Sequence, residues 1–386
     1  MTTSRYEPIN VSGHTDPEFT GVREAFESNL RNGDDFGASV AVYRHGRLVV
    51  DLWGGERDES GAPYPQDALH VGYSVTKGVM GLVLAGLVDT GEIDLDAPVA
   101  QYWPEFAEAG KGGILVRELA SHQAGLSAFE EPVTASDLSD WEACVNRLAA
   151  QTPRWTPGRR HGYHPLTLGY LVGEVIRRAT GRTVGSLLRE RFDTGPDTLQ
   201  AWIGLPAEHA DRVVPYRPGT PTPGIGECMA IADATKGSAT HAAFHNPEVS
   251  ADLFADPALW RPEIPAANGV FDARSLARLY SSAVDGPLRS ISTVTVDAVR
   301  RELAHGPDEV LVDQPTRFGT VFALSSPRQP MLGPGSFGAD GLGGHIAFAH
   351  PESGIAFAFL TTRAVYDPTP HTRLWRILSA VTAGLS

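Results

Sequence analysis

Residues 70–80 read His70-Val71-Gly72-Tyr73-Ser74-Val75-Thr76-Lys77-Gly78-Val79-Met80, where an extended segment gives way to an apolar run. This run predicts a helix from Ser74 to about Thr90. Because residues i and i+3 share one face of a helix, the hydroxyl of Ser74 and the amine of Lys77 can meet at its first turn. A neighbouring base makes a serine nucleophilic, and a lysine amine acts as a base when burial or positive potential lowers its pKa. The positive potential of a helix N-terminus also favours the anion that forms in acyl transfer.

The use of lysine makes this pair stand out. Only three of the 32 lysines and arginines are lysines: Lys77, Lys111 and Lys236. A guanidinium cannot act as a base near neutral pH, whereas a lysine amine can. The pattern is therefore that of a nucleophile with its base. The alternative is a serine that caps the helix and an unrelated surface lysine.

Length and composition limit the classes of protein to consider. The 386 residues predict two structural units or one large domain with an insertion, and an apolar fraction of 42% is enough for a core. The net charge of -14 argues against nucleic acid or an anionic membrane as a partner. Residues 1–16 show no signal-peptide pattern, and no segment is apolar over the length of a bilayer. With Cys144 and Cys228 read as separate thiols, the expected location is the cytoplasm.

Hydrophobic periodicity predicts an order of strands, helices and strands again. A helix over about 16–32 precedes a hairpin over 37–55. Further helices are predicted over about 114–121, 137–151, 167–180, 183–192, 272–283, 293–303 and 372–383, and strands over 200–204, 319–324, 345–349 and 355–361. This order predicts an α+β fold in which a mostly helical insertion splits one sheet layer. We expect a discontinuous sheet domain (1–73 and 290–386), a helical domain (74–289) and a site at their interface.

The stretch His161-Gly162-Tyr163-His164-Pro165-Leu166 lies between a Pro-Gly loop and a predicted helix. A tyrosine there can project into a cleft and share proton transfer with a lysine, although a core or surface tyrosine is the alternative. His161 and His164 have a spacing that a helical metal site could use, but no third ligand is spaced nearby.

Glycine-rich sequence precedes the strand predicted at His345. Residues 333–338 match the letters of a dinucleotide fingerprint, but a strand rather than a helix follows, so we interpret them as a turn. The glycines of 338–344 let backbone N–H groups approach a ligand, and one of them could complete an oxyanion hole with the amide of Ser74. The alternative is a simple hairpin entry.

Together these stretches resemble the serine β-lactamase and penicillin-binding-protein superfamily, in particular its class C β-lactamase-like branch with the family VIII carboxylesterases and related transacylases. The similar stretches arrive in the family's order and are 37–43, 51–55, 74–77, 116–126, 163–174 and 348–354. The resemblance implies a β-lactamase-like α+β fold with an antiparallel sheet flanked by helices. It also implies that Ser74 is the acylated nucleophile, Lys77 the general base and Tyr163 the second acid/base residue.

Two positions depart from the family pattern. The second motif of β-lactamases is Tyr-x-Asn, whereas Pro165 stands in its third position here. The third motif is Lys-Thr-Gly, or His/Trp-x-Gly in the esterases, and here it reads Ala339-Asp340-Gly341. His345 is a candidate substitute for the missing side chain. Without a group to bind the carboxylate of a β-lactam, the sequence disfavours an antibiotic hydrolase.

We therefore expect a serine hydrolase that acts through an acyl-enzyme on a small carboxylic ester or amide. The amides of Ser74 and Leu342, with Gly341 beside it, would hold the oxyanion. The first alternative is a transacylase of secondary metabolism that passes the acyl group to an alcohol or amine by the same Ser-Lys-Tyr chemistry, and the second is a non-catalytic binding module of the same fold. No cofactor, metal, nucleic acid or membrane is expected, and the oligomeric state is not predicted.

Overall fold

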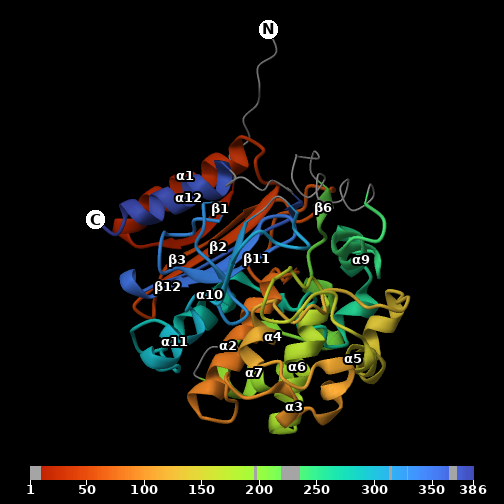
Figure 1. The fold of residues 1–386 in the computed structure, drawn as a ribbon. Helices are drawn as coiled ribbons and strands as arrows, with labels where there is room; N and C mark the ends of the chain where they lie inside the picture. Colours follow the sequence, from red (N-terminus) through yellow and green to blue (C-terminus); the bar gives the residue numbers. More distant parts are fainter. Residues whose placement is uncertain (1–9, 195–197, 219–234, 313–314, 328, 365–371) are drawn as a thin grey trace.

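A large antiparallel sheet runs through the molecule (Figure 1). The computed structural model describes residues 10–194, 198–218, 235–312, 315–327, 329–364 and 372–386. Within these ranges nine strands pair in the order β1-β3-β2-β13-β12-β11-β10-β9-β8. Their bounds are β1 Val11–Thr15, β2 Gly37–Arg44, β3 Arg47–Gly55, β8 Ala304–Gly306, β9 Thr316–Phe318, β10 Ala323–Leu324, β11 Phe337–Gly341, β12 His345–His350 and β13 Ile355–Thr361. Strands from the two ends of the chain therefore meet in one layer, through the pairing of β2 with β13.

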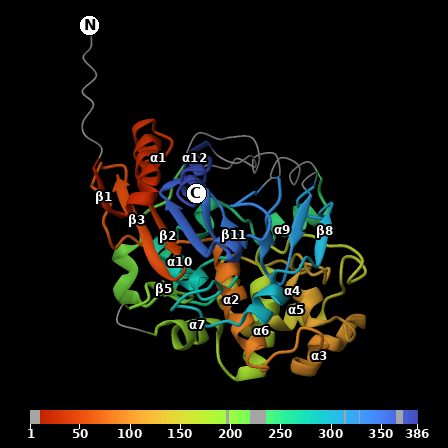
Figure 2. The ribbon, with the colours of Figure 1, turned by 90° about the vertical axis from the view of Figure 1, so that its left-hand side faces the viewer.

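Helices cover both faces of this sheet. On one face α1 (Thr20–Arg31) and α12 (Thr372–Ala383) lie side by side (Figures 1 and 2). On the other face α10 (Ala273–Ser281) packs on β2, β12 and β13, and α2 (Val75–Asp89) packs on β11 and β12. Every residue of β13 is buried, which explains its continuous apolar sequence.

The middle of the chain is mostly helical. Among the described residues its remaining α-helices are α3 Val99–Tyr102, α4 Val116–Ala120, α5 Trp141–Ala150, α6 Thr167–Thr180, α7 Val184–Phe192 and α9 Ala239–His245, and α11 (Thr293–Val299) follows α10. Helix α2 lies among them, and its residues from Val75 to Leu87 are all buried. A helix that is apolar all round belongs in a core. Gly78 makes this packing possible, because a Cβ there would lie 1.9 Å from the Tyr280 hydroxyl.

The described part of the chain also forms two small sheets. Strand β7 (Val270–Phe271) pairs with β4 (His70–Val71) and with β5 (Ala201–Trp202). This pairing fixes the segment that leads into Ser74. Strands β6 (Arg217–Pro218) and β14 (Arg363–Ala364) pair in parallel.

The structure confirms the α+β class and most of the predicted elements, among them the hairpin over 37–55 and the helices over 167–180 and 372–383. The continuous strand over 319–324 is wrong. Between β9 and β10 the chain turns back, with the Gly319 N–H donating to the Phe322 carbonyl and Val321 at a φ of +70°. The helix predicted over 293–303 ends at Val299, because the following residues lead into β8.

Other sequence-based expectations have different outcomes. The division into 1–73 with 290–386 and 74–289 stays a prediction, and α10, which falls in its helical part, packs on the sheet. Residues 333–336 lead into strand β11 and open no helix. Cys144 is a buried free thiol, whereas Cys228 lies outside the described residues. Among the described residues, no helix is long and apolar enough to cross a membrane.

Candidate active site

Ser74 stands at the N-terminus of α2, and Gly72 and Tyr73 separate it from strand β4. The preceding Tyr73 has a φ of +47°, a conformation that is uncommon for a residue with a bulky side chain. Its carbonyl accepts from the Thr76 N–H at 3.0 Å, so the turn leads directly into the helix. Ser74 is partly exposed although the helix behind it is buried. The Ser74 hydroxyl is thus accessible at the N-terminal end of a helix that is otherwise mostly buried.

Lys77 lies one turn further on the same helix face, with its side chain buried. Its Nζ is 3.0 Å from Ser74 Oγ, 2.6 Å from the Pro165 carbonyl oxygen and 2.9 Å from the Ala266 carbonyl oxygen. A neutral amine has two N–H donors and one lone pair. If the two N–H groups bond the two carbonyls, the lone pair is left for the proton of Ser74. Pro165 therefore takes part in the site through its backbone, although its side chain lacks the amide of the family motif.

Burial sets the protonation of this lysine. Desolvation lowers the pKa of Lys77 from 10.5 to about 7, and the carboxylate of Asp340 opposes this shift. A large fraction of Lys77 is then uncharged near neutral pH. The buried amine has the protonation state that a general base requires.

Tyr163 comes from the loop before α6 and contacts Ser74. Its hydroxyl lies 2.7 Å from Ser74 Oγ, and the Lys77 Nζ lies 4.9 Å from the centre of its ring. The ring packs against His122 and is stacked on Phe318, with centroid distances of 5.2 Å and 6.4 Å. The amine of Lys77 and the phenol of Tyr163 are thus each within hydrogen-bonding reach of the Ser74 hydroxyl.

A buried carboxylate, which no sequence pattern predicts, holds the backbone of Tyr163. Asp308 Oδ1 accepts from the Tyr163 N–H at 2.9 Å, and Asp308 Oδ2 accepts from the Thr316 hydroxyl at 3.0 Å. The same threonine hydroxyl lies 2.9 Å from Nε2 of His161. His161 is therefore connected to Asp308 through Thr316. No motif marks Asp308, since the contact depends on tertiary structure alone.

Two further histidines lie close to Tyr163 and are buried. The Nδ1 of His122 accepts from the His164 N–H at 3.0 Å, and the Nε2 of His164 accepts from the Leu126 N–H at 3.2 Å. Burial lowers the pKa of His164 to about 4 and that of His122 well below its usual value. Both rings are neutral, so they add no charge that would compete with Lys77 for the proton.

The glycine turn lies against the nucleophile segment. A Cβ on Gly341 would lie 2.4 Å from the Gly72 carbonyl oxygen and 3.2 Å from a methyl of Val75. Only a glycine lets β11 approach the start of α2 so closely. Leu342 follows and is partly buried, so the turn that carries its N–H begins beside the segment that carries Ser74.

The structure does not bring His345 to the three central side chains. It is buried, its Nδ1 accepts from the Thr361 N–H at 3.3 Å, and its ring packs on His70 and Tyr73. Burial lowers the pKa of His345 well below its usual value. Its described contacts are those of a core histidine under the glycine turn. Ala339 packs towards Gly78 and carries no polar group.

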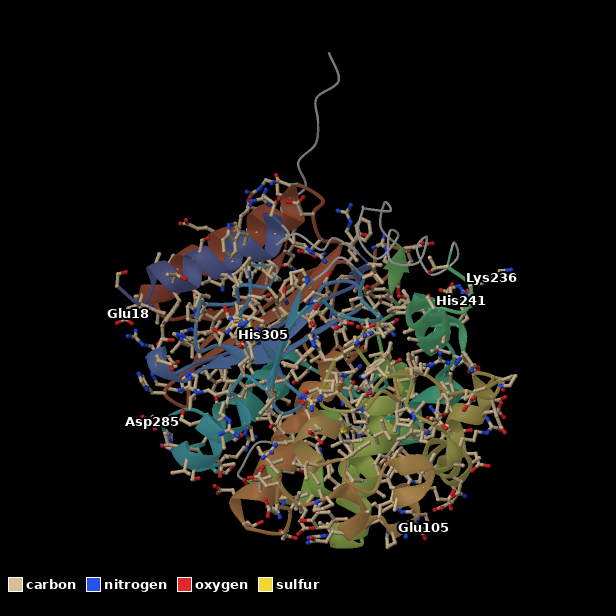
Figure 3. All side chains as sticks on the ribbon, in the orientation of Figure 1. Glu18, Glu105, Lys236, His241, Asp285 and His305 are labelled. Carbon is tan, nitrogen blue, oxygen red and sulfur yellow. The ribbon has the colours of Figure 1, made fainter. Side chains whose placement is uncertain are left out.

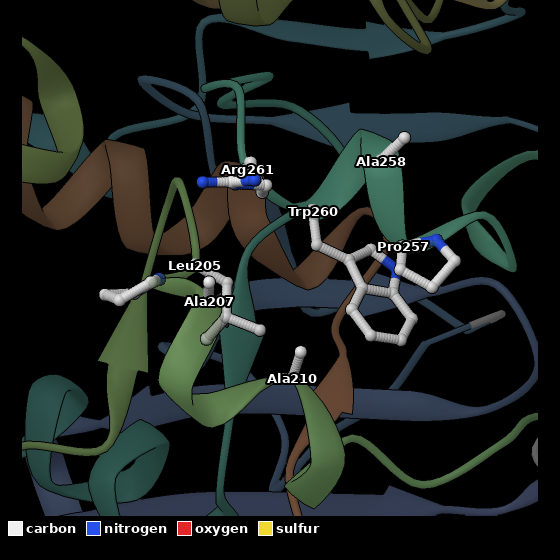
Figure 4. A pocket seen from close by; sticks show the side chains of 8 residues that line it. Leu205, Ala207, Ala210, Pro257, Ala258, Trp260 and Arg261 are labelled. Carbon is white, nitrogen blue, oxygen red and sulfur yellow. The ribbon is translucent and has the colours of Figure 1, made fainter.

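Other candidate features lie outside this group. Lys236 is exposed at the surface (Figure 3), whereas Lys111 is buried and donates to three backbone carbonyls. An open, mostly apolar hollow is lined by Leu205, Pro206, Ala207, Ala210, Pro257, Ala258, Trp260 and Arg261 (Figure 4). It contains none of the predicted site residues.

Comparisons with known proteins identify the family of this chain. The sequence profile of the family described as "Beta-lactamase" matches residues 23–382. This chain belongs to the beta-lactamase family. It is 35% identical over 368 residues to the "Esterase/beta-lactamase LipL" of Mycobacterium tuberculosis, covering 92% of this chain and 83% of that protein.

Two solved structures share the fold over nearly the whole chain. A crystal structure of a family VIII carboxylesterase superposes with a TM-score of 0.87 at 33% identity, covering 97% of this chain and 100% of that one. A penicillin-binding protein homologue from Caulobacter crescentus has the same TM-score at 37% identity, with the same coverage. The predicted superfamily is confirmed.

Proposed function

We propose that this protein is a serine carboxylesterase that works through an acyl-enzyme. The carrying observation is the convergence of a buried Lys77 amine and the Tyr163 hydroxyl on Ser74 Oγ, at 3.0 Å and 2.7 Å. An uncharged amine at this distance can take the serine proton. Relatives that share the fold over nearly the whole chain include proteins named as esterases, which supports ester substrates.

The first half-reaction forms the acyl-enzyme. The Ser74 Oγ attacks the ester carbonyl carbon while the Lys77 amine takes its proton. The carbonyl oxygen becomes an oxyanion, which the N–H groups of Ser74 and Leu342 stabilise. The bond to the leaving alkoxide then breaks, and the proton returns from Lys77 to the leaving alcohol through the Tyr163 hydroxyl.

The second half-reaction releases the acid. Water attacks the acyl carbonyl carbon and gives a proton to the Lys77 and Tyr163 pair. The bond from the carbonyl carbon to Ser74 Oγ breaks, and the serine recovers its proton. Transfer to an alcohol or amine would follow the same steps with a different nucleophile, so the two activities differ in acceptor binding and water access.

A carboxylic ester fits the site better than a β-lactam. Ala339 replaces the cationic or ring-nitrogen side chain of the family's third motif, and Asp340 places an exposed carboxylate next to it. The negative charge of Asp340 repels a substrate that carries its own carboxylate. We therefore propose neutral or cationic esters as the preferred substrates.

Intact-protein mass spectrometry tests this function and its alternative. The protein is incubated with p-nitrophenyl butyrate, with and without a primary amine. An acyl adduct that water discharges rapidly supports the esterase. An adduct that persists until the amine is added would identify a transacylase instead. If no adduct forms and no p-nitrophenol is released, the result would favour a non-catalytic binding module.

A further inference from the structure

One buried arginine of the C-terminal helix reaches the glycine turn beside Ser74. Arg373 lies in the first turn of α12, and its side chain is 3% exposed. Its Nη2 donates to the carbonyl oxygen of Gly343 at 2.9 Å, and its Nη1 donates to Asp35 Oδ1 at 2.5 Å. The guanidinium thus connects the turn to a fixed carboxylate.

The backbone of the turn leaves room for the guanidinium of Arg373. Gly343 and Gly344 have φ values of +85° and +99°, and the Gly344 N–H donates to the Gly341 carbonyl at 3.1 Å. A Cβ on Gly344 would lie 2.2 Å from Arg373 Nη2. Two successive glycines give the free backbone a wide choice of conformations. The hydrogen bond from Arg373 Nη2 to the Gly343 carbonyl restricts that choice.

The arginine is itself held firmly. Asp35 is buried and also accepts from the Thr361 hydroxyl at 2.8 Å, and the Asn29 side chain donates to the Arg373 carbonyl at 2.9 Å. Because β13 carries Thr361 and α1 carries Asn29, the anchor belongs to the sheet and its covering helices. The position of the turn is therefore set by the rigid part of the fold.

We infer that Arg373 is a positioning residue that orients the oxyanion turn by holding the Gly343 carbonyl. The dipeptide Leu342-Gly343 ends in this carbonyl. It begins with the Leu342 N–H, which is the proposed second oxyanion donor. A donor stabilises the tetrahedral intermediate only when it is already aimed at the oxyanion. This inference rests on the proposed esterase function, and it assigns no contact between Arg373 and substrate.

The test compares Arg373→Ala with Arg376→Ala. Arg376 lies on the same helix and pairs with Asp34 and Asn29, but it has no described contact with the turn. Steady-state hydrolysis of p-nitrophenyl butyrate gives kcat and KM, and inhibition by an arylboronic acid reports binding of a tetrahedral anion on Ser74. Arg373→Ala should lower kcat and boronic acid affinity by about 10- to 100-fold, part of the loss seen when an oxyanion donor is removed. KM should change little, and Arg376→Ala should retain both quantities.

A second variant covers the case in which Arg373→Ala does not fold. Asp35→Asn/Arg373→Met removes both charges together, so no buried carboxylate is left unpaired. A folded variant with wild-type kcat and boronic acid affinity would overturn the inference while leaving the esterase function intact. If wild-type turnover were absent or independent of Ser74, the proposed function itself would fail. Lower thermal stability with unchanged kcat and affinity would likewise overturn the inference and leave Arg373 a purely structural role.

Discussion

The Nζ of Lys77 lies 3.0 Å from the Oγ of Ser74 while two backbone carbonyls, of Pro165 and Ala266, accept its other hydrogen bonds. The side chain is buried with no carboxylate paired to it among the described residues. This arrangement holds the amine in place without stabilising its charge as an ion pair would. The proposed chemistry depends on that balance.

Replacing Lys77 by Met should abolish most of the esterase activity. The methionine keeps the buried volume but offers no proton acceptor, so kcat/KM should fall by about 10²- to 10⁴-fold, the usual contribution of a general base. Hydrolysis of p-nitrophenyl butyrate measures this. Lys111→Met is the matched control, because Lys111 is also buried and bonded to three carbonyls. It should lower thermal stability and leave kcat/KM of the folded fraction near wild type, and equal losses in both variants would contradict the assignment.

Activity should rise with pH through about 7. Only the uncharged amine accepts the serine proton, and burial lowers the pKa of Lys77 to about 7, so kcat/KM should increase tenfold per pH unit below this value and level off above it. The carboxylate of Asp340 raises the pKa of Lys77. Asp340→Asn should therefore move the midpoint of the pH–rate profile to lower pH. A midpoint unchanged in Lys77→Met would assign the titration to another group.

Tyr163→Phe should separate packing from proton transfer. The phenylalanine ring keeps the contacts with His122 and Phe318, so the thermal midpoint should stay close to wild type. Loss of the hydroxyl removes the group 2.7 Å from Ser74 Oγ, and kcat should fall by about 10²-fold or more. Stopped-flow release of p-nitrophenol, compared with differential scanning calorimetry, measures both. A variant with wild-type kcat would show that the hydroxyl has no catalytic part.

Asp308 should support the site from behind Tyr163. Asp308→Ala removes the acceptor of the Tyr163 N–H and of the Thr316 hydroxyl, and should lower the free energy of unfolding by about 1–3 kcal/mol for buried donors left unpaired. We also expect a lower kcat, even at temperatures where the variant is fully folded, because the Tyr163 N–H loses its acceptor. Asp308→Asn keeps one acceptor oxygen and should lose less of both. Urea titration and kcat at 25 °C distinguish the two effects.

Features that depend on the local sequence pattern could be predicted from the sequence. The apolar run after Ser74 fixed α2, and the i, i+3 spacing placed Lys77 next to the serine as expected. The partner Tyr163 was identified because it precedes a helix after a Pro-Gly loop and matches a family motif. These three residues meet in the structure as predicted, although their catalytic roles stay a prediction.

Contacts made by the backbone or across the fold were not predictable in this way. The carbonyls of Pro165 and Ala266 carry no residue signature, and Asp308 is one of many aspartates in the chain. The strand expected over 319–324 was wrong because Val321 adopts a positive φ, which a strand-forming residue rarely does. His345 was a candidate because it follows the third motif closely in the sequence, but its ring packs in the core.

Covalent labelling of the nucleophile tests the central claim most directly. The wild-type protein and Ser74→Ala are each incubated with a fluorophosphonate, and intact mass and peptide mapping locate the adduct. The account predicts one phosphonyl group on Ser74 of the wild-type protein and none on the variant. Undiminished labelling of Ser74→Ala, or an adduct on another residue of the wild type, would contradict it.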